Sequence, residues 1–208
     1  MNARNLPNSA PALPSARRSG DWIIGWKVAN LLLEETGGIA FSSLYQYGII
    51  TYYGYDAVAE CSVFPGHKAP EATHRCGFNA MDERSDAKEL RRNAIRRPSS
   101  NYVPENLVLL RVGLYGRVQE GTYPDGRTWG YKAERQRIAN VFIPQACGVK
   151  NCSADSVSLG TLVTDVYALP GTAYLRPLCA EHISASPQPI SLSQASTRFN
   201  NVPFVWET

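Results

Sequence analysis

The amino-acid sequence predicts an α+β protein: a mainly antiparallel β body with one amphipathic helix and two loop regions, each clamped by a zinc ion. Three observations predict this class. Apolar and aromatic segments typical of strands recur along the chain, one segment has helical periodicity, and the cysteines and histidines fall into two groups of four. At 208 residues, 44% apolar and 19% charged, the chain can bury a core of its own.

Residues 1–20 are expected to form a flexible arm, because they hold three prolines and three arginines but no apolar run. Such a segment is neither a signal peptide nor a membrane anchor. No stretch of the chain approaches the roughly 20 apolar residues of a membrane span. We therefore expect a cytoplasmic protein with no membrane association, in a reducing compartment where cysteines bind metals more often than they form disulfides.

Residues 21–98 are predicted to form a β-rich zinc-loop region that ends in a helix. Asp21–Val28 alternates like a strand, and Ile39–Tyr55 is rich in Tyr, Ile and Phe. Asp82–Arg97 is different, because its apolar residues recur at helical spacing and Pro98 follows it. The apolar positions of this predicted helix are Ala87, Leu90 and Ala94.

Residues 99–143 are predicted to form a β-hairpin region packed on the same body. Leu107–Val118 alternates between an apolar and a polar face, and residues 121–126 are typical of a turn. Arg127–Ile143 is expected to return as a second strand, although residues 131–138 also fit the start of a helix and periodicity does not decide between them. The apolar face holds Leu110, Val112, Leu114 and Val118, and the polar face holds Arg111, Tyr115 and Arg117.

The rest of the chain is predicted to form a zinc knuckle over residues 144–186 and a tail over residues 187–208. The tail is rich in Ser, Gln and Pro until its last apolar stretch, Val202–Trp206. We expect this stretch to dock back on the β body.

The first candidate metal group has the spacing C-x5-H-x6-H-x-C-G. Its four donors fall within a short segment that contains Pro65, Gly66 and Gly77, which allow tight bends. Zinc takes four nitrogen or sulfur ligands in a tetrahedron and accepts many loop shapes around it. The predicted ligands are Cys61, His67, His74 and Cys76.

The second candidate metal group has the spacing C-x4-C-x26-C-x2-H. Two close pairs joined by a longer excursion are typical of zinc fingers and ribbons, and Asp155–Leu175 is expected to form a hairpin between the pairs. The predicted ligands are Cys147, Cys152, Cys179 and His182. Together the two groups use all five cysteines and all three histidines of the chain. Taken singly, each residue also fits a plainer role, since a lone cysteine is often a small buried hydrophobe.

Ile24–Ala80 resembles a group of uncharacterised small zinc-binding proteins from actinobacteria and their phages. The shared elements are a Gly-Trp-basic-Val opening, an aromatic-x-Gly element before the first Cys, a His-x-Ala-Pro element and a Cys-x-Cys-Gly element. This chain departs from the group at His74, where the group has the first Cys of the last element, and zinc accepts either ligand. The resemblance implies a similar fold and metal binding, and it implies no activity. The matching elements are Gly25–Val28, Tyr52–Gly54 with Ala59–Cys61, His67–Pro70 and His74–Gly77.

The predicted helix also carries a basic stripe, which favours nucleic-acid binding. Its cations recur every four residues and therefore lie along one helix face, as a phosphate backbone requires. The plainer interpretation is a solvated helix face partly neutralised by Asp86 and Glu89. The net charge of +3 is small, so any nucleic-acid contact must be local. The candidate contacts are Arg84, Lys88, Arg91, Arg92 and Arg96, and a second basic strip comprises Arg111, Arg117, Arg127, Lys132, Arg135 and Arg137.

The predicted function is therefore a zinc-stabilised binding protein with two structural zinc ions. The alternative is a protein–protein interaction module, directed at a phage or host partner, that presents aromatic side chains. An enzyme is less favoured, because two closed sites leave no histidine or thiol for catalysis, although carboxylate-only chemistry stays open. The sequence makes no prediction about oligomeric state. The candidate aromatic contacts are Phe64, Phe78, Trp129 and Tyr131.

Overall fold

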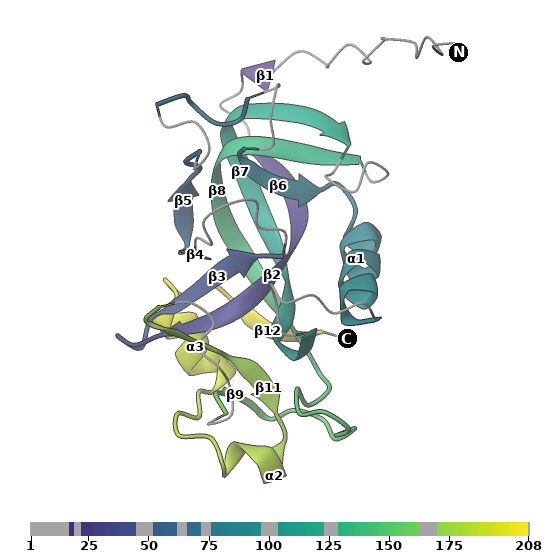
Figure 1. Cartoon of the computed structure of the whole chain (residues 1–208), viewed down its shortest axis with the longest axis vertical. Helices are drawn as coiled ribbons and strands as arrows, with labels where there is room; N and C mark the ends of the chain where they lie inside the picture. The colour runs from purple at the N-terminus through teal and green to yellow at the C-terminus, as the bar shows by residue number, and fades with distance from the viewer. Residues whose placement is uncertain are drawn as a thin grey trace, which may run out of the picture.

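A curved, mainly antiparallel β sheet makes up most of the protein, with α1 and α3 packed on it and with α2 beside a separate two-stranded sheet of β9 and β11 (Figure 1). The structure is a computed structural model, and it describes residues 17–18, 22–44, 52–61, 66–71, 76–96, 104–122, 129–162 and 170–207. The predicted α+β class is confirmed. The predicted arm, residues 1–20, lies outside the described residues except for its two-residue strand β1.

The strands and helices follow one another along the chain in this order. The N-terminal elements are β1 (Arg17–Arg18), β2 (Ile23–Glu34), β3 (Ile39–Ser43), β4 (Tyr52–Tyr53), β5 (Asp56–Val58), β6 (Phe78–Met81) and α1 (Arg84–Arg96). The later elements are a 3-10 turn (Pro104–Asn106), β7 (Leu107–Thr122), β8 (Trp129–Pro144), β9 (Ser158–Gly160), β10 (Thr172–Tyr174), β11 (Arg176–Leu178), α2 (Ala180–Ile183), α3 (Leu192–Arg198) and β12 (Phe204–Glu207).

The hairpin of β7 and β8 is the longest feature of the sheet, with 16 residues in each strand. The strand interpretation of residues 127–143 is therefore the correct one, and the helical alternative is wrong from Trp129 onward. The alternation predicted for β7 is confirmed, because its apolar face is buried and Arg111 and Arg117 are exposed. The pairings of β7 with β8, β8 with β6, β6 with β2 and β2 with β7 close into a ring, so the sheet curls on itself.

Two hydrophobic clusters cover the two faces of this curled sheet. The smaller cluster joins α1 to the sheet through Ala87, Leu90 and Ala94, which pack near Met81 and Leu109. The predicted helix and its apolar face are thus confirmed. The helix begins at Arg84, two residues later than predicted, and Arg97 at its predicted end lies outside the described residues. The larger cluster includes β3, α3 and β12 and forms the main core. Figure 1 shows α1 alongside the sheet and α3 against its lower part.

The C-terminal stretch docks on the sheet, as predicted. Strand β12 pairs with β8 in parallel, with Phe204 beside Val141 and Glu207 beside Pro144. The hairpin predicted within Asp155–Leu175 is wrong. Strand β9 pairs with β11, which begins beyond that segment, and β10 pairs with β2. No helix in the described ranges is long and apolar enough to cross a membrane.

A buried carboxylate at the end of β12 attracts three cations of α1. The side chain of Glu207 is only 6% exposed, and its oxygens lie 2.5 Å from Arg91 Nη1, 3.1 Å from Lys88 Nζ and 3.9 Å from Arg84 Nη2. These contacts are ion pairs without aligned hydrogen bonds at the carboxylate. These ion pairs therefore link α1 to β12, although the two elements are far apart in the sequence.

A buried lysine lies in the main core. Lys27 is 3% exposed, donates a hydrogen bond from Nζ to Gln136 Oε1 at 3.4 Å, and places Nζ 4.6 Å from the ring centre of Tyr53. Burial lowers the pKa of Lys27 from its ordinary 10.5 to about 7, because the charged form loses its hydration. The aromatic face and the amide oxygen replace only part of that hydration.

Replacing the buried carboxylate should destabilise the protein. Glu207→Gln leaves Arg91, which is 14% exposed, without its counter-charge. We expect a loss of about 2–4 kcal/mol in the free energy of unfolding, less than for a fully buried pair because the other two cations are partly hydrated. Urea titration measures the loss. The control is Glu89→Gln, which removes an exposed carboxylate from the same helix, and an equal loss in both variants would contradict this account of Glu207.

The buried lysine should make stability depend on pH above neutrality. Between its folded pKa of about 7 and its ordinary value of 10.5, the unfolded chain holds a proton on Lys27 that the folded chain has released. The free energy of unfolding should therefore rise with pH in this window, by at most about 1.4 kcal/mol per pH unit. Urea titrations across the window should show the rise in the unaltered protein and in Lys150→Met, and its loss in Lys27→Met. A rise that persists in Lys27→Met would refute this assignment.

Candidate metal centres

The second Cys/His group is assembled from two separate segments of the chain, residues 147–152 and 179–182. Cys147 follows the end of β8, Cys152 lies in the turn after it, Cys179 follows β11, and His182 lies on α2. The pairing of β9 with β11 and the hydrogen bond from Gly148 N–H to Pro177 O bring these parts together. The four donors that the sequence predicts for this group therefore meet at one place, where they can hold a metal ion.

The separations between these donors match the edges of a small tetrahedron. Cys152 Sγ and Cys179 Sγ are 3.9 Å apart, and His182 Nδ1 lies 3.2 Å from Cys179 Sγ and 3.5 Å from Cys147 Sγ. A tetrahedral zinc with ordinary bond lengths gives roughly 3.8 Å between two sulfurs and roughly 3.6 Å between sulfur and nitrogen. A disulfide would require roughly 2.0 Å, and all five cysteines are free thiols. The four donors are thus spaced for a metal ion, not for disulfide formation.

Burial and hydrogen bonding shift the pKa values of Cys147 and Cys179 in this group. Burial raises the pKa of Cys147, because it disfavours the thiolate. The pKa of Cys179 is lowered to about 7, first by the backbone N–H of His182 and further by the His182 side chain, against the opposing effect of burial. Cys179 is the N-cap residue of α2, and the backbone N–H groups of Glu181 and His182 in the first turn favour its thiolate form. Cys179 is therefore prepared to bind a metal as a thiolate at neutral pH.

The first Cys/His group lies near the other end of the molecule. Cys61 follows β5, His67 lies in the next described segment, and Cys76 precedes β6. His67 Nε2 is 3.2 Å from Cys76 Sγ, and the three donors lie within 4.8 Å of one another. These three residues can hold a metal ion. The fourth predicted ligand, His74, lies outside the described residues.

Gly77 explains why a glycine follows the last cysteine of this group. Its φ of +104° is a conformation that residues with a side chain rarely adopt, and a Cβ there would approach Pro70 Cβ at 3.0 Å and Ala133 O at 3.1 Å. Burial raises the pKa of the neighbouring Cys76. The glycine therefore lets the chain turn tightly against β8 with the thiol held inward.

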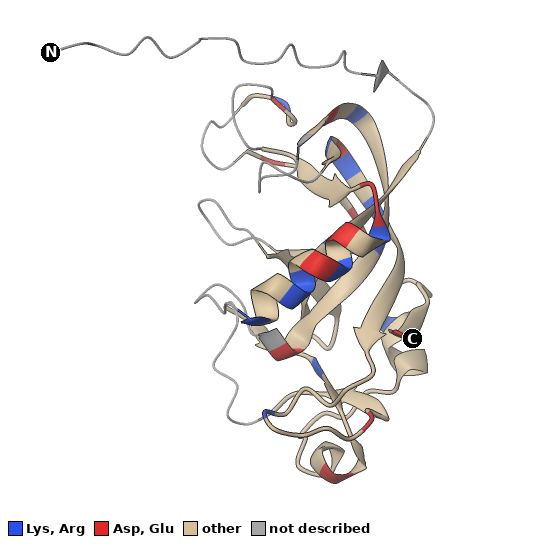
Figure 2. Cartoon of the chain, turned by 90° about the vertical axis from the view of Figure 1, so that its right-hand side faces the viewer, with Lys and Arg blue, Asp and Glu red and all other residues tan. Residues whose placement is uncertain are grey.

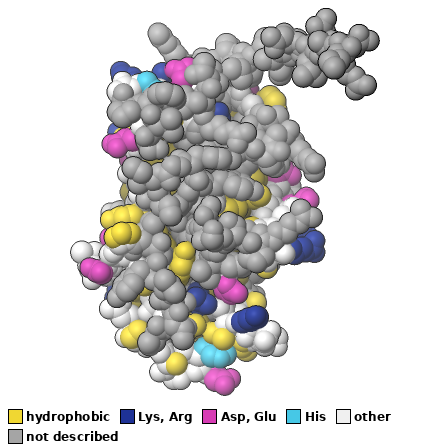
Figure 3. Space-filling view, viewed as in Figure 1, with side chains coloured by type: hydrophobic (Ala, Val, Ile, Leu, Met, Phe, Trp, Pro, Cys, Tyr) yellow, Lys and Arg dark blue, Asp and Glu magenta, His cyan; other side chains and the backbone are white. Residues whose placement is uncertain are grey.

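The two groups are separate sites. Cys147 and Cys179 belong to a small hydrophobic cluster of their own, distinct from the main core. In Figure 1, α2 lies at the lower end of the molecule and β6 in its upper half, and Figure 3 shows histidine side chains toward both ends of this face. A metal at one site can therefore be lost without direct loss of the other.

The basic stripe of α1 is only partly available to a partner. Arg84, Lys88 and Arg91 converge on Glu207, and the Arg84 guanidinium also lies 4.7 Å from the ring centre of Phe142. Arg92 and Arg96 are exposed. Figure 2 shows acidic residues interspersed with basic ones along the ribbon of α1. The structure thus places the five predicted cations on one helix, and three of them form ion pairs with Glu207.

The second basic strip also contains both exposed cations and a cation in an ion pair. Arg111, Arg117 and Arg135 are exposed on β7 and β8, and Arg117 forms an ion pair with Glu134 at 3.7 Å. Arg127 lies outside the described residues. Among the aromatic residues considered for protein contacts, Phe78 and Tyr131 are half-buried against the core, Trp129 is exposed, and Phe64 lies outside the described residues.

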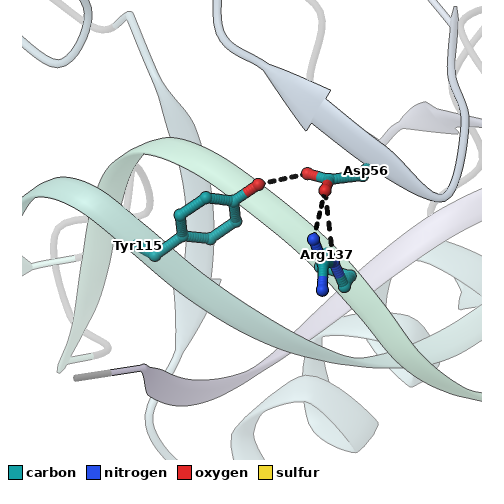
Figure 4. Close-up of polar contacts among 3 residues, drawn as sticks. All are labelled: Asp56, Tyr115 and Arg137. Atoms are coloured by element: carbon teal, nitrogen blue, oxygen red, sulfur yellow. Dashed lines mark hydrogen bonds and ion pairs between the residues drawn. The ribbon is translucent and has the colours of Figure 1, made fainter. Parts of the chain in front are cut away.

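A polar cluster on the sheet surface was missed by sequence reasoning. Asp56 accepts hydrogen bonds from the Tyr115 hydroxyl and from Nε and Nη2 of Arg137, the latter two at 3.1 and 2.6 Å (Figure 4). Burial alone would raise the pKa of Asp56, but these hydrogen bonds and the charges of Arg137 and Arg135 outweigh it and hold the pKa below its ordinary value. No motif links Asp56 to residues on distant strands, so only the fold reveals the cluster.

Single substitutions should remove one metal ion at a time. We expect Cys179→Ser to lose the metal of the second group and Cys76→Ser that of the first, with each variant keeping the other ion, because the groups are separate. Each loss should also lower the thermal midpoint, since structural metal binding contributes on the order of 10 kcal/mol to small domains. Elemental analysis together with thermal denaturation measures both effects. An unchanged metal content and midpoint in either variant would refute its assignment as a ligand.

Comparison with protein-family models, with curated proteins and with solved structures finds no match for this chain. The interpretation of the two groups therefore rests on their geometry and on the chemistry of their donors.

Proposed function

We propose that this chain is a zinc-stabilised nucleic-acid-binding protein with two structural zinc ions. The observation that supports it best is the set of four closely spaced donors in the second group. Three thiols and one imidazole favour zinc over magnesium or calcium, which prefer oxygen ligands. Four protein donors fill a tetrahedral shell and leave no position for a catalytic water, so the ion stabilises structure.

A structural ion is needed where this group lies. Strands β9 and β11 have three residues each. Helix α2 has four residues, and none of the residues of this helix is buried. Elements this short gain little from hydrogen bonding alone and are marginal in water. A zinc ion bound by Cys147, Cys152, Cys179 and His182 would fasten the end of β8, the start of α2 and the turn between them as one unit.

The first group would be completed as a Cys2His2 site by His74. The three described donors, Cys61, His67 and Cys76, come from segments that join β5 to β6. Both strands pair with β8, so an ion here would fasten their connection to the central hairpin. Zinc accepts this ligand set as readily as the Cys3His set of the second group.

The nucleic-acid part of the proposal is supported by the cations that the fold leaves exposed. Arg92 and Arg96 lie one turn apart on α1, and neither forms an ion pair within the described part of the chain. Two adjacent guanidinium groups suit a phosphate backbone, because each can bind a phosphate through two hydrogen bonds. The small net charge of +3 agrees with a local contact of this kind.

The salt dependence of binding tests this contact. For a labelled single-stranded oligonucleotide, the slope of log K against log salt should become shallower by about 1.4 in Arg92→Gln/Arg96→Gln, because about 0.7 counterions are released for each phosphate contact. Fluorescence anisotropy at several salt concentrations measures the slope.

The matched control is Lys150→Gln/Arg198→Gln, which removes two exposed cations from other parts of the surface. It should leave the slope of the unaltered protein in place. A slope that does not change when Arg92 and Arg96 are replaced would refute nucleic-acid binding by α1. Specific capture of a protein partner by the unaltered chain, lost in the same variant, would favour the interaction-module alternative.

A further inference from the structure

An exposed tryptophan lies on the sheet surface beside the polar cluster of Asp56, Tyr115 and Arg137. Trp22 precedes β2, and 45% of its side chain is exposed. Its ring stacks on Tyr115 with centroids 4.7 Å apart, and the Arg137 guanidinium lies 4.9 Å from its centre. The exposed part of the indole offers a flat apolar surface on which another ring can stack.

The sheet leaves room for the indole at one glycine. Ile24 pairs with Gly113, and Gly113 pairs with Arg137, so these residues stand side by side on three adjacent strands. A Cβ at Gly113 would lie 2.3 Å from Trp22 Cε3, which is closer than atoms can approach. The missing side chain therefore allows Trp22 to lie against the sheet and reach across it toward Arg137.

The guanidinium beside the indole is held in place. Asp56 accepts two hydrogen bonds from Arg137 and a third from Tyr115, as Figure 4 shows. Arg137 also lies 5.5 Å from the ring centre of Tyr55. An arginine fixed between aromatic rings presents a flat, weakly hydrated face at low entropic cost, as stacking on a ligand requires.

A surface pocket of about 260 Å³ opens next to these side chains. Its walls include Trp22, Ile24, Tyr55 and Arg137, with Asn200 and Asn201 at the turn before β12. Within the described residues, the side-chain amides of Asn200 and Asn201 form no hydrogen bond to the protein. The volume lies below the roughly 300–1,000 Å³ of pockets for drug-sized ligands, so it fits a single planar ring system better than a larger molecule.

We propose that this pocket binds a nucleobase, which stacks on the exposed surface of Trp22 beside the Arg137 guanidinium. The asparagine amides can donate and accept hydrogen bonds at the edge of a base. Arg135, exposed on the same strand two residues from Arg137, lies 5.2 Å from the ring centre of Tyr115 and adds a positive charge to this surface. The base can belong to a free nucleotide or to a single strand. None of these residues belongs to α1, so the site is independent of the contact proposed there.

Removing the indole should remove the binding. We expect Trp22→Ala to weaken binding of a labelled single strand of about eight nucleotides by roughly 5- to 150-fold, the usual effect of deleting an aromatic stacking partner. Trp22→Phe should recover part of the affinity, because it keeps a flat ring. Fluorescence anisotropy measures the oligonucleotide, and isothermal titration with adenosine monophosphate tests the free nucleotide.

Two controls separate stacking from charge and from unfolding. Trp129→Ala removes a tryptophan that is 48% exposed near the far end of β8 and should leave binding unchanged. An abasic oligonucleotide keeps the phosphates but has no base to stack, so it should bind the unaltered protein as weakly as the normal strand binds Trp22→Ala. Circular dichroism confirms that each variant is folded.

The outcomes distinguish the sources of the base and the two proposals. Binding of adenosine monophosphate that is lost in Trp22→Ala assigns the pocket to a free nucleotide, and loss with the oligonucleotide alone assigns it to a single strand. The nucleobase site is overturned if neither ligand distinguishes Trp22→Ala from Trp129→Ala, or if the abasic strand binds as well as the normal one. Either result leaves the salt-slope test of α1 unaffected.

Discussion

The pairing of β7 with β8 is the interaction on which the rest of the structure depends. Each strand has 16 residues, and between them they pair with β1, β2, β5, β6 and β12. Side chains on one face of the hairpin enter the main core, and residues near the start of β7 contact α1. A long antiparallel hairpin with a buried apolar face can form locally, and it then offers edges and faces on which shorter elements assemble.

Some elements attached to this hairpin are very short, and a bound metal ion would stabilise them. Cys147 lies in the loop that follows β8. Cys61 follows β5 and Cys76 precedes β6, and both of these strands pair with β8. Around the second group the elements have only three or four residues each, so a metal ion held by its four donors would add stability to them. Charge serves a similar purpose at the C-terminus, where buried Glu207 ties β12 to α1 through three cations.

Local patterns made much of this structure predictable. The helix near Asp82–Arg97 and the alternation of Leu107–Val118 depend on residues close in sequence, and the structure agrees with them. The Cys/His spacing placed seven of the eight predicted ligands in the groups that the structure brings together, and the eighth, His74, lies outside the described residues. Contacts between distant residues were not predictable. The parallel pairing of β12, the pairing of β9 with β11 and the ion pairs of Glu207 with α1 have no periodic signal. The sequence pattern of α1 therefore suggested more available positive charge than the structure has. The carboxylate that pairs with three of its cations, Glu207, lies more than a hundred residues later in the chain.

X-ray absorption at the zinc edge, on protein purified without added metal, tests the central claim most directly. If the five cysteines and three histidines of the chain are all ligands of two zinc ions, the average shell holds about 2.5 sulfurs at about 2.3 Å and about 1.5 nitrogens at about 2.0 Å, and this is the result that the account predicts. A shell rich in oxygen, a single zinc ion per chain, or sulfur–sulfur bonds in place of zinc would contradict it.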